Sequence, residues 1–410
     1  MKASSTNFTA LDIGSSKISI LGVDMQSDGE ARVGYQGIFR STGIKSGLIH
    51  DYDQAEHSII SAIYNLENDT QQNISNISIL LSGVGVKSMY IYKKVKLLEG
   101  RVSSADVKAL NNKAVETFND TSQTVLHYFP IEYTLDQNHS INNPVGMFGN
   151  VLGCKMHVIT SDTGQIANIL NCFSKCHINV KDILVGVFAS SLAVLTEDEK
   201  TLGSVVIDFG SDTTSFAIFA KGNLLYTKFI PLGGNHITSD IAKILSISMK
   251  NAEKLKVMYG SALRANIDTE NIINLAEFGA SPSNDDEMNI TSNDLSSIIS
   301  ARAEEIVEII KSEYDKTFLD HLVGRRVVLT GGGSQLRGMK EIVASNFNKQ
   351  VRVGHPLNIP GFESDHTTQS FCACIGLVKY EMSKLKKQSS FAKASQTIMH
   401  KISSWLRDPA

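Results

Sequence analysis

The stretch VIDFGSDTTSFAIF, residues Val206–Phe219, decides the fold, because a second stretch, ALDIGSSKISIL at Ala10–Leu21, repeats its pattern. Each runs apolar residue, Asp, apolar residue, Gly, Ser, and continues through polar residues into a β-branched and apolar segment. This pattern predicts a strand, a tight turn and a second strand, with a carboxylate and small side chains at the tip of the hairpin. Two unrelated hairpins can share such a pattern by chance, so the repeat alone leaves a duplication open.

A third glycine-rich tip favours the duplication. The stretch RRVVLTGGGSQLRGMKEIVASNF, Arg325–Phe347, predicts a strand, then Gly331, Gly332 and Gly333, and then a helix. Glycines between a strand and the N-terminus of a helix let the backbone approach a phosphate or an adenosine closely, with the helix dipole assisting. The three tips together therefore predict a nucleotide site.

The segments between the tips indicate an α/β protein. His50–Asn68 and Asp294–Phe318 have the apolar spacing of amphipathic helices. The chain turns polar from about Gly279 to Asn293, which predicts an exposed loop. At 410 residues the chain is too long for one core. Short strands that alternate with helices, together with the repeated tips, predict two similar halves that face one cleft.

Composition and charge exclude some classes of function. The formal net charge is −3, but residues 384–410 alone carry +5, so the remainder carries −8. An acidic body argues against general nucleic-acid binding, and a basic tail favours a negatively charged partner of its own. No apolar run has the length of a signal peptide or a membrane span. The five cysteines form no zinc-type CxxC pair, which favours a reduced cytoplasmic protein; Cys372 and Cys374 fit either buried small residues or a redox pair.

Two hairpins that face each other would supply what a nucleoside triphosphate needs, namely backbone N–H groups around its phosphates and carboxylates that hold Mg²⁺ directly or through water. Asp12 and Asp208 are the candidate metal-side carboxylates, and Lys17 adds a cation. The candidate phosphate donors are Ser15, Ser16, Thr213 and Thr214. The sequence contains neither GxxxxGK[ST] nor GxGxxG, which excludes the two commoner phosphate-binding designs.

These motifs resemble those of the actin-like ATPase superfamily, which includes actin, bacterial actins, sugar kinases and DnaK-type chaperones. The resemblance implies an α/β fold of the ribonuclease H-like type, with two lobes around a cleft that binds ATP and Mg²⁺. The hairpins resemble the two phosphate loops, LTGGGSQLRG the adenosine loop, and PLGGNHITSDIAKIL with NAEKLKVMYG the remaining wall. The implied phosphate-binding residues are Asp12, Gly14, Ser15, Ser16, Lys17, Asp208, Gly210, Ser211, Thr213, Thr214, Gly233 and Gly234, and the implied adenosine-binding residues are Glu253, Lys256, Gly331, Gly332, Gly333 and Gln335. Taken alone, Glu253 and Lys256 also fit a solvated surface pair one helical turn apart.

Three further stretches resemble the FtsA family of bacterial cell-division proteins: GIKSGLIHDYDQAEHSI, INNPVGMFGNVLGCKMHVIT and SSWLR. This resemblance extends from about Phe8 to Leu406. It implies an ATP-binding, self-associating protein that tethers FtsZ filaments to the cytoplasmic face of the inner membrane at the division septum and helps recruit later divisome proteins. The implied partners are the FtsZ C-terminal peptide, further copies of the chain, anionic lipids and divisome membrane proteins, with no nucleic acid among them.

The family resemblance also implies a division into subdomains. Subdomain 1A comprises residues 1–82, 160–200 and 366–383; subdomain 1C, an insertion at 83–159, contacts division partners; subdomain 2A comprises 201–232 and 301–365; subdomain 2B comprises 233–300; a basic linker at 384–390 leads to a membrane-targeting amphipathic helix at 391–407. Subdomain 2B is expected to receive the FtsZ peptide. Its candidate basic contacts are Lys243, Lys250, Lys254, Lys256 and Arg264.

Two positions depart from the superfamily pattern. Actin-like enzymes that hydrolyse ATP readily place Glu or Gln about 22 residues before the second-loop Asp, where it positions or activates water. Counting back from Asp208 reaches Gly186, so hydrolysis is expected to be slow or negligible. The second loop, usually DxGGGT, has Ser211 and Asp212 in place of two glycines. A carboxylate near the terminal phosphate would repel it unless Mg²⁺ or Lys17 intervenes.

The C-terminal stretch FAKASQTIMHKISSWLRDPA contains Trp405, the only tryptophan of the chain. On a helical wheel its apolar residues fall within an arc of roughly 140°. The candidate membrane-binding residues are Phe391, Ile398, Ile402, Trp405 and Leu406 on the apolar face, with Lys393, Lys401 and Arg407 as basic contacts. A helix docked on its own domain is the alternative, but the basic polar face and a tryptophan at the end of the apolar face favour a membrane surface.

Three other functions are weighed against a membrane tether. A sugar or small-carboxylate kinase needs a catalytic carboxylate beside the acceptor hydroxyl, which the sequence does not supply convincingly. A DnaK-like chaperone needs a long substrate domain after the ATPase. A pilus-assembly actin-like protein would bind a different peptide, so a pull-down with an FtsZ tail peptide and a pilus-protein tail peptide separates it from the tether.

Overall fold

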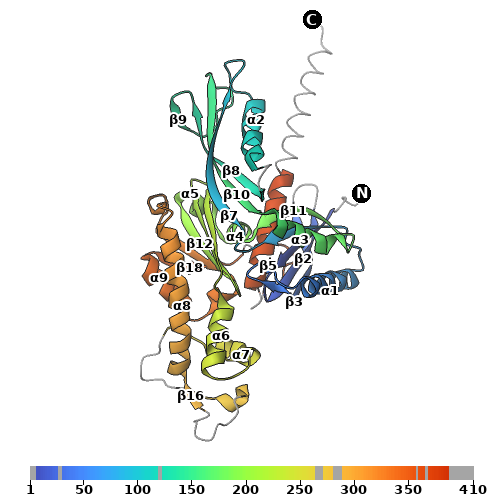
Figure 1. Cartoon of the computed structure of the whole chain (residues 1–410), viewed down its shortest axis with the longest axis vertical. Helices are drawn as coiled ribbons and strands as arrows, with labels where there is room; N and C mark the ends of the chain where they lie inside the picture. Colours follow the sequence, from blue (N-terminus) through green and yellow to red (C-terminus); the bar gives the residue numbers. More distant parts are fainter. Residues whose placement is uncertain are drawn as a thin grey trace.

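The structure, a computed structural model, describes residues 6–25, 30–118, 122–263, 271–279, 289–356, 359–364 and 368–386. Two five-stranded sheets form its frame, in the orders β3-β2-β1-β6-β11 and β14-β13-β12-β17-β18 (Figure 1). The first comprises β1 (Thr6–Ile13), β2 (Lys17–Met25), β3 (Ala31–Arg40), β6 (Asn76–Leu81) and β11 (Asn179–Val185). The second comprises β12 (Ser204–Phe209), β13 (Thr214–Ala220), β14 (Asn223–Ile230), β17 (Arg326–Thr330) and β18 (Gln350–Val353).

The two sheets repeat one topology. In each, the first strand pairs antiparallel with the second, as β1 with β2 and β12 with β13, and parallel with a later strand, as β1 with β6 and β12 with β17. Asp12 lies opposite Ser19 in the first hairpin, and Asp208 lies opposite Ser215 in the second. The predicted hairpins and the predicted duplication into two similar halves are therefore confirmed.

Helices cover the outer face of each sheet. The helices α1 (Tyr52–Thr70) and α3 (Thr163–Ser174) pack on the first sheet, where the cluster includes Leu11, Ile20 and Ile59. The helices α8 (Ser292–Asp315) and α9 (Met339–Phe347) pack on the second sheet. Caps set the starts of the two long helices, because Asp51 accepts from the backbone of Gln54 and Thr291 forms a capping box with Asp294. Both amphipathic helices predicted from the sequence are thus present, with ends shifted by two or three residues.

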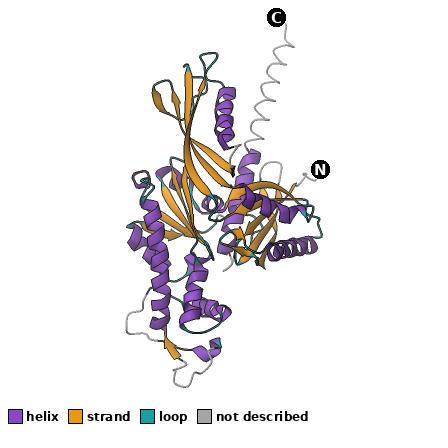
Figure 2. Ribbon diagram, viewed as in Figure 1, coloured by secondary structure: helices purple, strands orange, loops and turns teal. Residues whose placement is uncertain are grey.

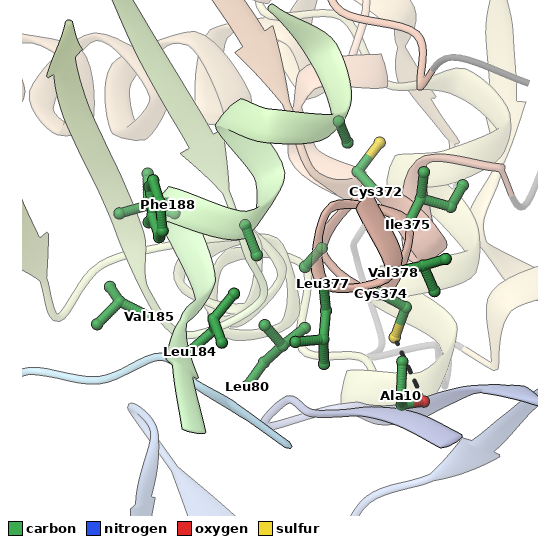
Figure 3. Packing of buried hydrophobic residues seen from close by; sticks show 14 of the residues in the cluster. Ala10, Leu80, Leu184, Val185, Phe188, Cys372, Cys374, Ile375, Leu377 and Val378 are labelled. Carbon is green, nitrogen blue, oxygen red and sulfur yellow. Dashed lines mark hydrogen bonds between the residues drawn. The ribbon is translucent and has the colours of Figure 1, made fainter. Parts of the chain in front are cut away.

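Two central helices separate the sheets, α4 (Gly186–Val194) and a helix over residues 372–386 (Figure 3). A β-carbon on Gly376 would lie 1.7 Å from the carbonyl oxygen of Ala189, so only glycine permits this crossing. Cys372 and Cys374 are buried in the same cluster as free thiols. Alternating residues of the strands face these helices and the outer helices in turn, which is the period of two expected for a sheet covered on both faces.

A four-stranded sheet, in the order β7-β10-β8-β9, stands apart from the frame and has a core of its own (Figure 2). It comprises β7 (Lys87–Lys96), β8 (Gln123–Leu135), β9 (Asn138–Ile141) and β10 (Val151–Asp162), with α2 (Ser104–Val115) against it. The hydroxyl of Tyr90 donates to the carbonyl of Leu225 at 2.6 Å, and His157 Nδ1 donates to the carbonyl of Leu224 at 2.9 Å. The insertion therefore contacts the edge strand β14 of the second half.

A small helical unit extends the second half. It comprises α6 (Gly234–Ile244), α7 (Met249–Tyr259), β15 (Ile272–Asn274), β16 (Asn289–Thr291) and the start of α8. Of the predicted exposed loop at 279–293, residues 289–293 instead form β16 and the first turn of α8, and residues 280–288 lie outside the described residues. The remaining short elements are β4 (Ile44–Lys45), β5 (Leu48–Ile49), α5 (Glu197–Leu202) and the 3-10 turns Glu116–Phe118, Leu275–Phe278 and Asp320–Leu322.

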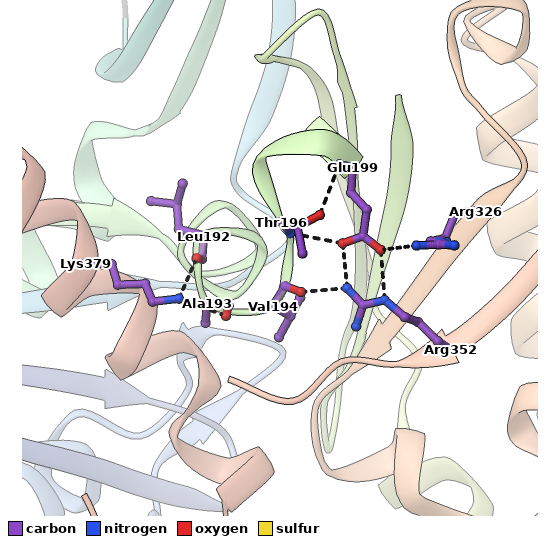
Figure 4. A network of polar contacts seen from close by, with 8 residues as sticks. All are labelled: Leu192, Ala193, Val194, Thr196, Glu199, Arg326, Arg352 and Lys379. Carbon is purple, nitrogen blue, oxygen red and sulfur yellow. Dashed lines mark hydrogen bonds and ion pairs between the residues drawn. The ribbon is translucent and has the colours of Figure 1, made fainter. Parts of the chain in front are cut away.

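A buried carboxylate fastens α5 to the second sheet (Figure 4). Glu199 accepts two hydrogen bonds from Arg352, at 2.9 and 2.6 Å, and one from Arg326 at 3.1 Å. Burial alone would raise the pKa of the Glu199 carboxyl, but the hydrogen bonds from Arg352, from the Thr196 N–H and from Arg326 lower this pKa to about 2. The group is therefore a carboxylate throughout the physiological range of pH.

The C-terminal helix runs further than the sequence predicts. Residues 384–386, assigned to the basic linker, continue the helix that starts at 372. Lys384 pairs with Asp182 at 2.9 Å and with Glu381 at 3.1 Å, which holds this turn against β11. The predicted membrane helix at 391–407, with all its candidate residues, and Arg264 lie outside the described residues. Among the described helices, none is both long and apolar enough to cross a bilayer.

Candidate nucleotide site

A cavity of about 680 Å³ opens between the two halves of the molecule. Of the residues predicted to bind phosphate or adenosine, all but one line it. These are Asp12, Gly14, Ser15, Ser16, Lys17, Asp208, Gly210, Ser211, Thr213, Gly233, Gly234, Glu253, Lys256, Gly331, Gly332, Gly333 and Gln335. Residues separated by more than three hundred positions in the sequence therefore converge on one space.

The two hairpin tips have the same closing geometry. The N–H of Gly14 donates to the carbonyl of Lys17 at 3.0 Å, and the N–H of Gly210 donates to the carbonyl of Thr213 at 2.9 Å. A β-carbon on Gly14 or Gly210 would lie 2.9 or 2.7 Å from those same carbonyl oxygens. Each tip therefore requires glycine, and each aims its backbone at the cavity from one half of the molecule.

The start of α6 is locked onto the second tip. The N–H groups of Gly234 and Asn235 donate to the carbonyls of Gly210 and Ser211, at 3.0 and 2.7 Å. A β-carbon on Gly233 would lie 2.6 Å from the Ser211 carbonyl oxygen, so glycine allows this close contact. The tip and the helix therefore form one rigid wall of the cavity.

The glycine turn after β17 packs directly on Asp208, a candidate ligand of a metal ion. Gly331 has a φ of 81°, and a β-carbon there would lie 2.3 Å from Oδ1 of Asp208. The three glycines lead into a short 3-10 helix, Gly332–Gln335, and α9 begins only after Gly338. The sequence predicted a helix directly after the glycines, whereas α9 starts a few residues later, at Met339.

Two buried carboxylates and one ammonium group influence one another electrostatically in this cavity. Burial, and next the charge of Asp208, raise the pKa of Asp12 to about 7, while Lys17 opposes the rise. Burial also raises the pKa of Asp208, against a hydrogen bond of 2.7 Å from the Ser190 hydroxyl and the charge of Lys17. Burial lowers the pKa of Lys17. The excess negative charge fits a divalent cation, which prefers carboxylate and phosphate oxygens.

The described residues contain no group of three or more His, Cys, Asp or Glu side chains that could hold a metal alone. Asp12 and Asp208 therefore fit a Mg²⁺ ion that takes its other ligands from water and substrate phosphates, which is the usual arrangement for this ion.

Glu253 and Lys256 are more than a surface pair. Lys256 Nζ lies 2.7 Å from Glu253 Oε2, and it donates to the Gly234 carbonyl at 3.0 Å and to the Thr238 hydroxyl at 2.8 Å. The hydroxyl of Thr238 in turn donates to Glu253 at 2.5 Å. This network ties α7 to the first turn of α6 beside the cavity, while the Glu253 side chain stays 47% exposed. Binding of adenosine by the pair stays a prediction.

Thr214 is the predicted phosphate donor that does not line the cavity. Its side chain is buried, and its hydroxyl donates to the Leu232 carbonyl at 2.8 Å. Neighbouring side chains in a strand point to opposite faces, so the orientation of Thr213 toward the cavity turns Thr214 away. Asp212 also stays out of the lining, since its carboxylate accepts from the Asn235 side chain at 2.7 Å. The expected repulsion of a phosphate by Asp212 stays a prediction, with the carboxylate acting from beside the lining residues Ser211 and Thr213.

Gly186 has no room for the side chain of a catalytic Glu or Gln. A β-carbon there would lie 1.8 Å from Ser82 Oγ. Ser82 lines the cavity instead, together with Ser190 of α4.

Several lining residues were not found from the sequence. They are Ser82, Ser190, Val257, Gly260, Ile306, Leu336, Arg337, Met339, Gln369, Ser370, Cys372 and Ala373. Most belong to no phosphate motif and reach the cavity through tertiary packing. The exceptions are Leu336 and Arg337, which follow the glycine turn in the predicted adenosine loop, and Val257 and Gly260, which lie in the stretch NAEKLKVMYG. These four could have been named with their motifs.

Comparisons with known proteins identify the family. The family described as "Cell division protein FtsA" matches residues 205–376, and the family described as "SHS2 domain inserted in FTSA" matches residues 83–160. The Cell division protein FtsA of Rhizobium meliloti (strain 1021) is 31% identical over 385 residues, which cover 91% of this chain and 86% of that protein. The Cell division protein FtsA of Escherichia coli (strain K12) is 28% identical over 404 residues, which cover 97% of this chain and 95% of that protein.

Solved structures agree on the fold. A chain of the PilM-PilN type IV pilus biogenesis complex superposes with a TM-score of 0.65 at 15% identity, covering 92% of this chain and 99% of that chain. MreB5 of Spiroplasma citri bound to ADP superposes with a TM-score of 0.52 at 14% identity, covering 93% and 98%. At such identities the likeness shows the actin-like fold alone. The family matches and the relatives above show that the chain belongs to the FtsA family of cell division proteins.

Proposed function

We propose that the protein binds ATP with Mg²⁺ in the central cavity, associates with further copies of itself, and tethers FtsZ filaments to the cytoplasmic face of the inner membrane at the division septum. The convergence of the two Asp-x-Gly-Ser tips and of Lys17 on one cavity is the observation that carries nucleotide binding. Membership of a family of cell division proteins supports the cellular role.

The phosphates are assigned to the part of the cavity lined by the two hairpin tips. Backbone N–H groups and hydroxyls of the tips, with Ser15, Ser16, Ser211 and Thr213, surround them, and Lys17 supplies a cation. Asp12 and Asp208 hold Mg²⁺ directly or through water. An ADP-bound structure of an MreB protein with this fold supports the choice of an adenine nucleotide.

The adenosine is assigned to the opposite end. Glu253 and Lys256 flank the ribose, Gly331–Gly333 and Gln335 give close access to the backbone, and Leu336 and Ile306 offer apolar surface for the base. Arg337 lines the same end and can stack on a planar ring.

ATP acts here mainly as a ligand that sets the conformation of the protein, and its hydrolysis contributes little. Gly186 has no side chain, so no carboxylate or amide at that position can activate water. Hydrolysis is accordingly slow or negligible.

The partners are assigned to separate surfaces. The unit of α6, α7 and the start of α8 receives the FtsZ C-terminal peptide, with Lys243, Lys250 and Lys254 as candidate contacts. The inserted sheet contacts neighbouring copies and the divisome membrane proteins recruited later. The tail at 391–407 binds anionic lipid through its apolar face and basic residues. One tail binds weakly, and many tails held along a filament bind strongly through effective concentration.

Flotation with anionic vesicles tests the tether. The full chain is compared with a chain that ends at Lys386, which retains the helix and its Lys384 ion pairs, with and without ATP–Mg²⁺ and FtsZ filaments. We expect only the full chain to float, more completely with ATP, and to carry FtsZ with it. A third chain with Lys393, Lys401 and Arg407 changed to Gln separates the charge contribution from the apolar one. Flotation of the truncated chain, or of neither chain, would contradict the membrane role.

A further inference from the structure

A four-residue 3-10 helix, η5 (Thr368–Phe371), carries two neighbouring side chains that bond to opposite halves of the molecule. The hydroxyl of Ser370 accepts a hydrogen bond of 2.5 Å from Lys17 Nζ, on the first hairpin. Gln369 donates to the Gly354 carbonyl at 2.7 Å and accepts from the Thr330 hydroxyl at 3.3 Å, both on the second half. Because both side chains line the cavity, η5 joins the two walls beside the proposed phosphates.

Lys17 needs a fixed partner to act on a phosphate. Its ammonium group sits on a flexible stem of four carbons, so its position is set by the groups around it. The carboxylates of Asp12 and Asp208 attract it electrostatically, and Ser370 is the acceptor that receives its hydrogen bond. A lysine has three N–H donors, so the bond to Ser370 leaves two for a phosphate and a carboxylate.

Ser370 itself retains a proton to donate. A hydroxyl accepts through its lone pairs and donates through its single hydrogen. Its oxygen accepts from Lys17, and Ser370 lines the cavity, so its O–H is free to point at an anionic oxygen there. A hydrogen bond to a charged phosphate oxygen is stronger than one between neutral groups.

We propose that Ser370 is a phosphate-positioning residue of this site: it fixes the ammonium of Lys17, donates its own hydroxyl hydrogen to a bound phosphate, and so lets ATP order the start of the helix at 372–386. The assignment rests on the proposed binding of ATP, and it adds a contact from the last described segment of the chain to a site otherwise built from the two hairpins, α6, α7 and the glycine turn.

The helix that follows Ser370 is well placed to transmit such a contact. Lys379 donates to the carbonyls of Leu192 and Ala193, at 3.3 and 3.1 Å, and Lys384 pairs with Asp182. The helix is thus fixed to its surroundings along its length, and its first turn borders the cavity through Cys372 and Ala373. Ordering of η5 by a phosphate therefore reduces the opening of this helix as a unit.

Three variants of the full chain test the assignment. Ser370→Ala removes the hydroxyl, Ser370→Thr restores it, and Ser383→Ala is the matched control, because among the described residues the Ser383 hydroxyl bonds to the Tyr380 carbonyl of its own helix alone. Titration calorimetry gives the affinities for ATP–Mg²⁺ and for adenosine. Hydrogen exchange over residues 368–386, with and without ATP–Mg²⁺, reports the order of the helix.

We expect Ser370→Ala to weaken ATP about tenfold, the loss of one charge-assisted hydrogen bond, and to leave adenosine within about twofold. Ser370→Thr returns the ATP affinity to within about threefold, and ATP protects residues 368–386 in the wild type and in Ser383→Ala but not in Ser370→Ala.

Unchanged ATP affinity and protection in Ser370→Ala would overturn the assignment, and so would an equal loss for ATP and adenosine, which would indicate a merely structural role. A wild-type chain that binds no ATP would refute the proposed nucleotide function, and this assignment with it, which is distinct from both of those results.

Discussion

The hydroxyl of Ser190 donates a hydrogen bond of 2.7 Å to Oδ2 of Asp208. This bond connects α4, which lies between the two sheets, to the second hairpin tip, and it stabilises the charged form of Asp208 against the effect of burial. The protonation state of Asp208 and the position of α4 are therefore linked.

Removing that bond should weaken Mg²⁺-dependent nucleotide binding. We expect Ser190→Ala to lower the affinity for ATP–Mg²⁺ by about tenfold, since a hydrogen bond to a charged group contributes about 1.5 kcal/mol or more. Titration calorimetry gives the affinity. Ser191→Ala is the matched control, because Ser191 bonds only to the Val187 carbonyl of its own helix. An equal loss in the two variants would point to a weakened helix.

Neutralising Asp208 should abolish the benefit of Mg²⁺. In Asp208→Asn we expect the ATP affinity to be the same with Mg²⁺ and with EDTA, because one of the two metal-side carboxylates is missing. Asp212→Asn, four residues further along, should behave as the wild type, since Asp212 faces Asn235 and stays out of the cavity lining. A loss of Mg²⁺ dependence in Asp212→Asn would contradict the orientation described for this loop.

Alanine substitutions at Gly331 and Gly332 differ in the space that the structure leaves for a β-carbon. Gly331→Ala places a β-carbon 2.3 Å from Asp208 Oδ1 at a φ of 81°, whereas the nearest atom to a β-carbon on Gly332 is Lys17 Nζ at 3.9 Å. We expect Gly331→Ala to lose about 1–2 kcal/mol of stability through the left-handed backbone alone, together with nucleotide binding. Gly332→Ala should keep both. Thermal unfolding with and without ATP–Mg²⁺ measures both effects.

Glu199 should make stability depend on pH in the acid range. Its pKa in the folded protein is about 2, below the ordinary 4.5, so the unfolded chain binds its proton first. The stabilisation is complete above about pH 5 and is lost as the pH falls toward 2; a shift of this size corresponds to about 3 kcal/mol. Glu199→Gln should unfold at lower urea concentration at pH 7 and show a flatter profile between pH 5 and 2.

Glu197→Gln is the control for that profile. Glu197 belongs to the same helix, but its side chain is 87% exposed and pairs only with Lys200. Exposed pairs contribute about 0–1 kcal/mol, so this variant should follow the wild type at every pH. If Glu199→Gln and Glu197→Gln showed the same dependence of stability on pH, Glu199 would have no special role in that dependence.

The sequence predicted those parts of the site that depend on local chemistry. The Asp-x-Gly-Ser tips, the glycine turn, α1 and α8 follow from turn residues and apolar spacing that act within a few positions. Ser370 could not be predicted in this way, because its partner Lys17 lies 353 residues away and only the packing of the last helix brings them together. Ser82 and Ser190 reach the cavity for the same reason.

Some differences between the predictions from the sequence and the structure could have been avoided. The alternation of side chains along a strand already excludes that Thr213 and Thr214 both face the cavity. The boundary at 384 is a different case. A basic run suggests a linker, but the ion pair of Lys384 with Asp182 on a distant strand decides that the helix continues.

The inserted sheet has a mechanical consequence for the cleft. It is joined by the chain to the first half, yet it bonds to β14 of the second through Tyr90 to Leu225, His157 to Leu224, and the N–H of Thr227 to the Ser88 hydroxyl. At about 1 kcal/mol for each bond, molecules that have released all of them make up roughly one in a hundred. The inserted sheet therefore holds the two halves together at the edge formed by β14. We therefore expect the two halves to separate away from β14 if the cleft opens, and a nucleotide to enter and leave on that side.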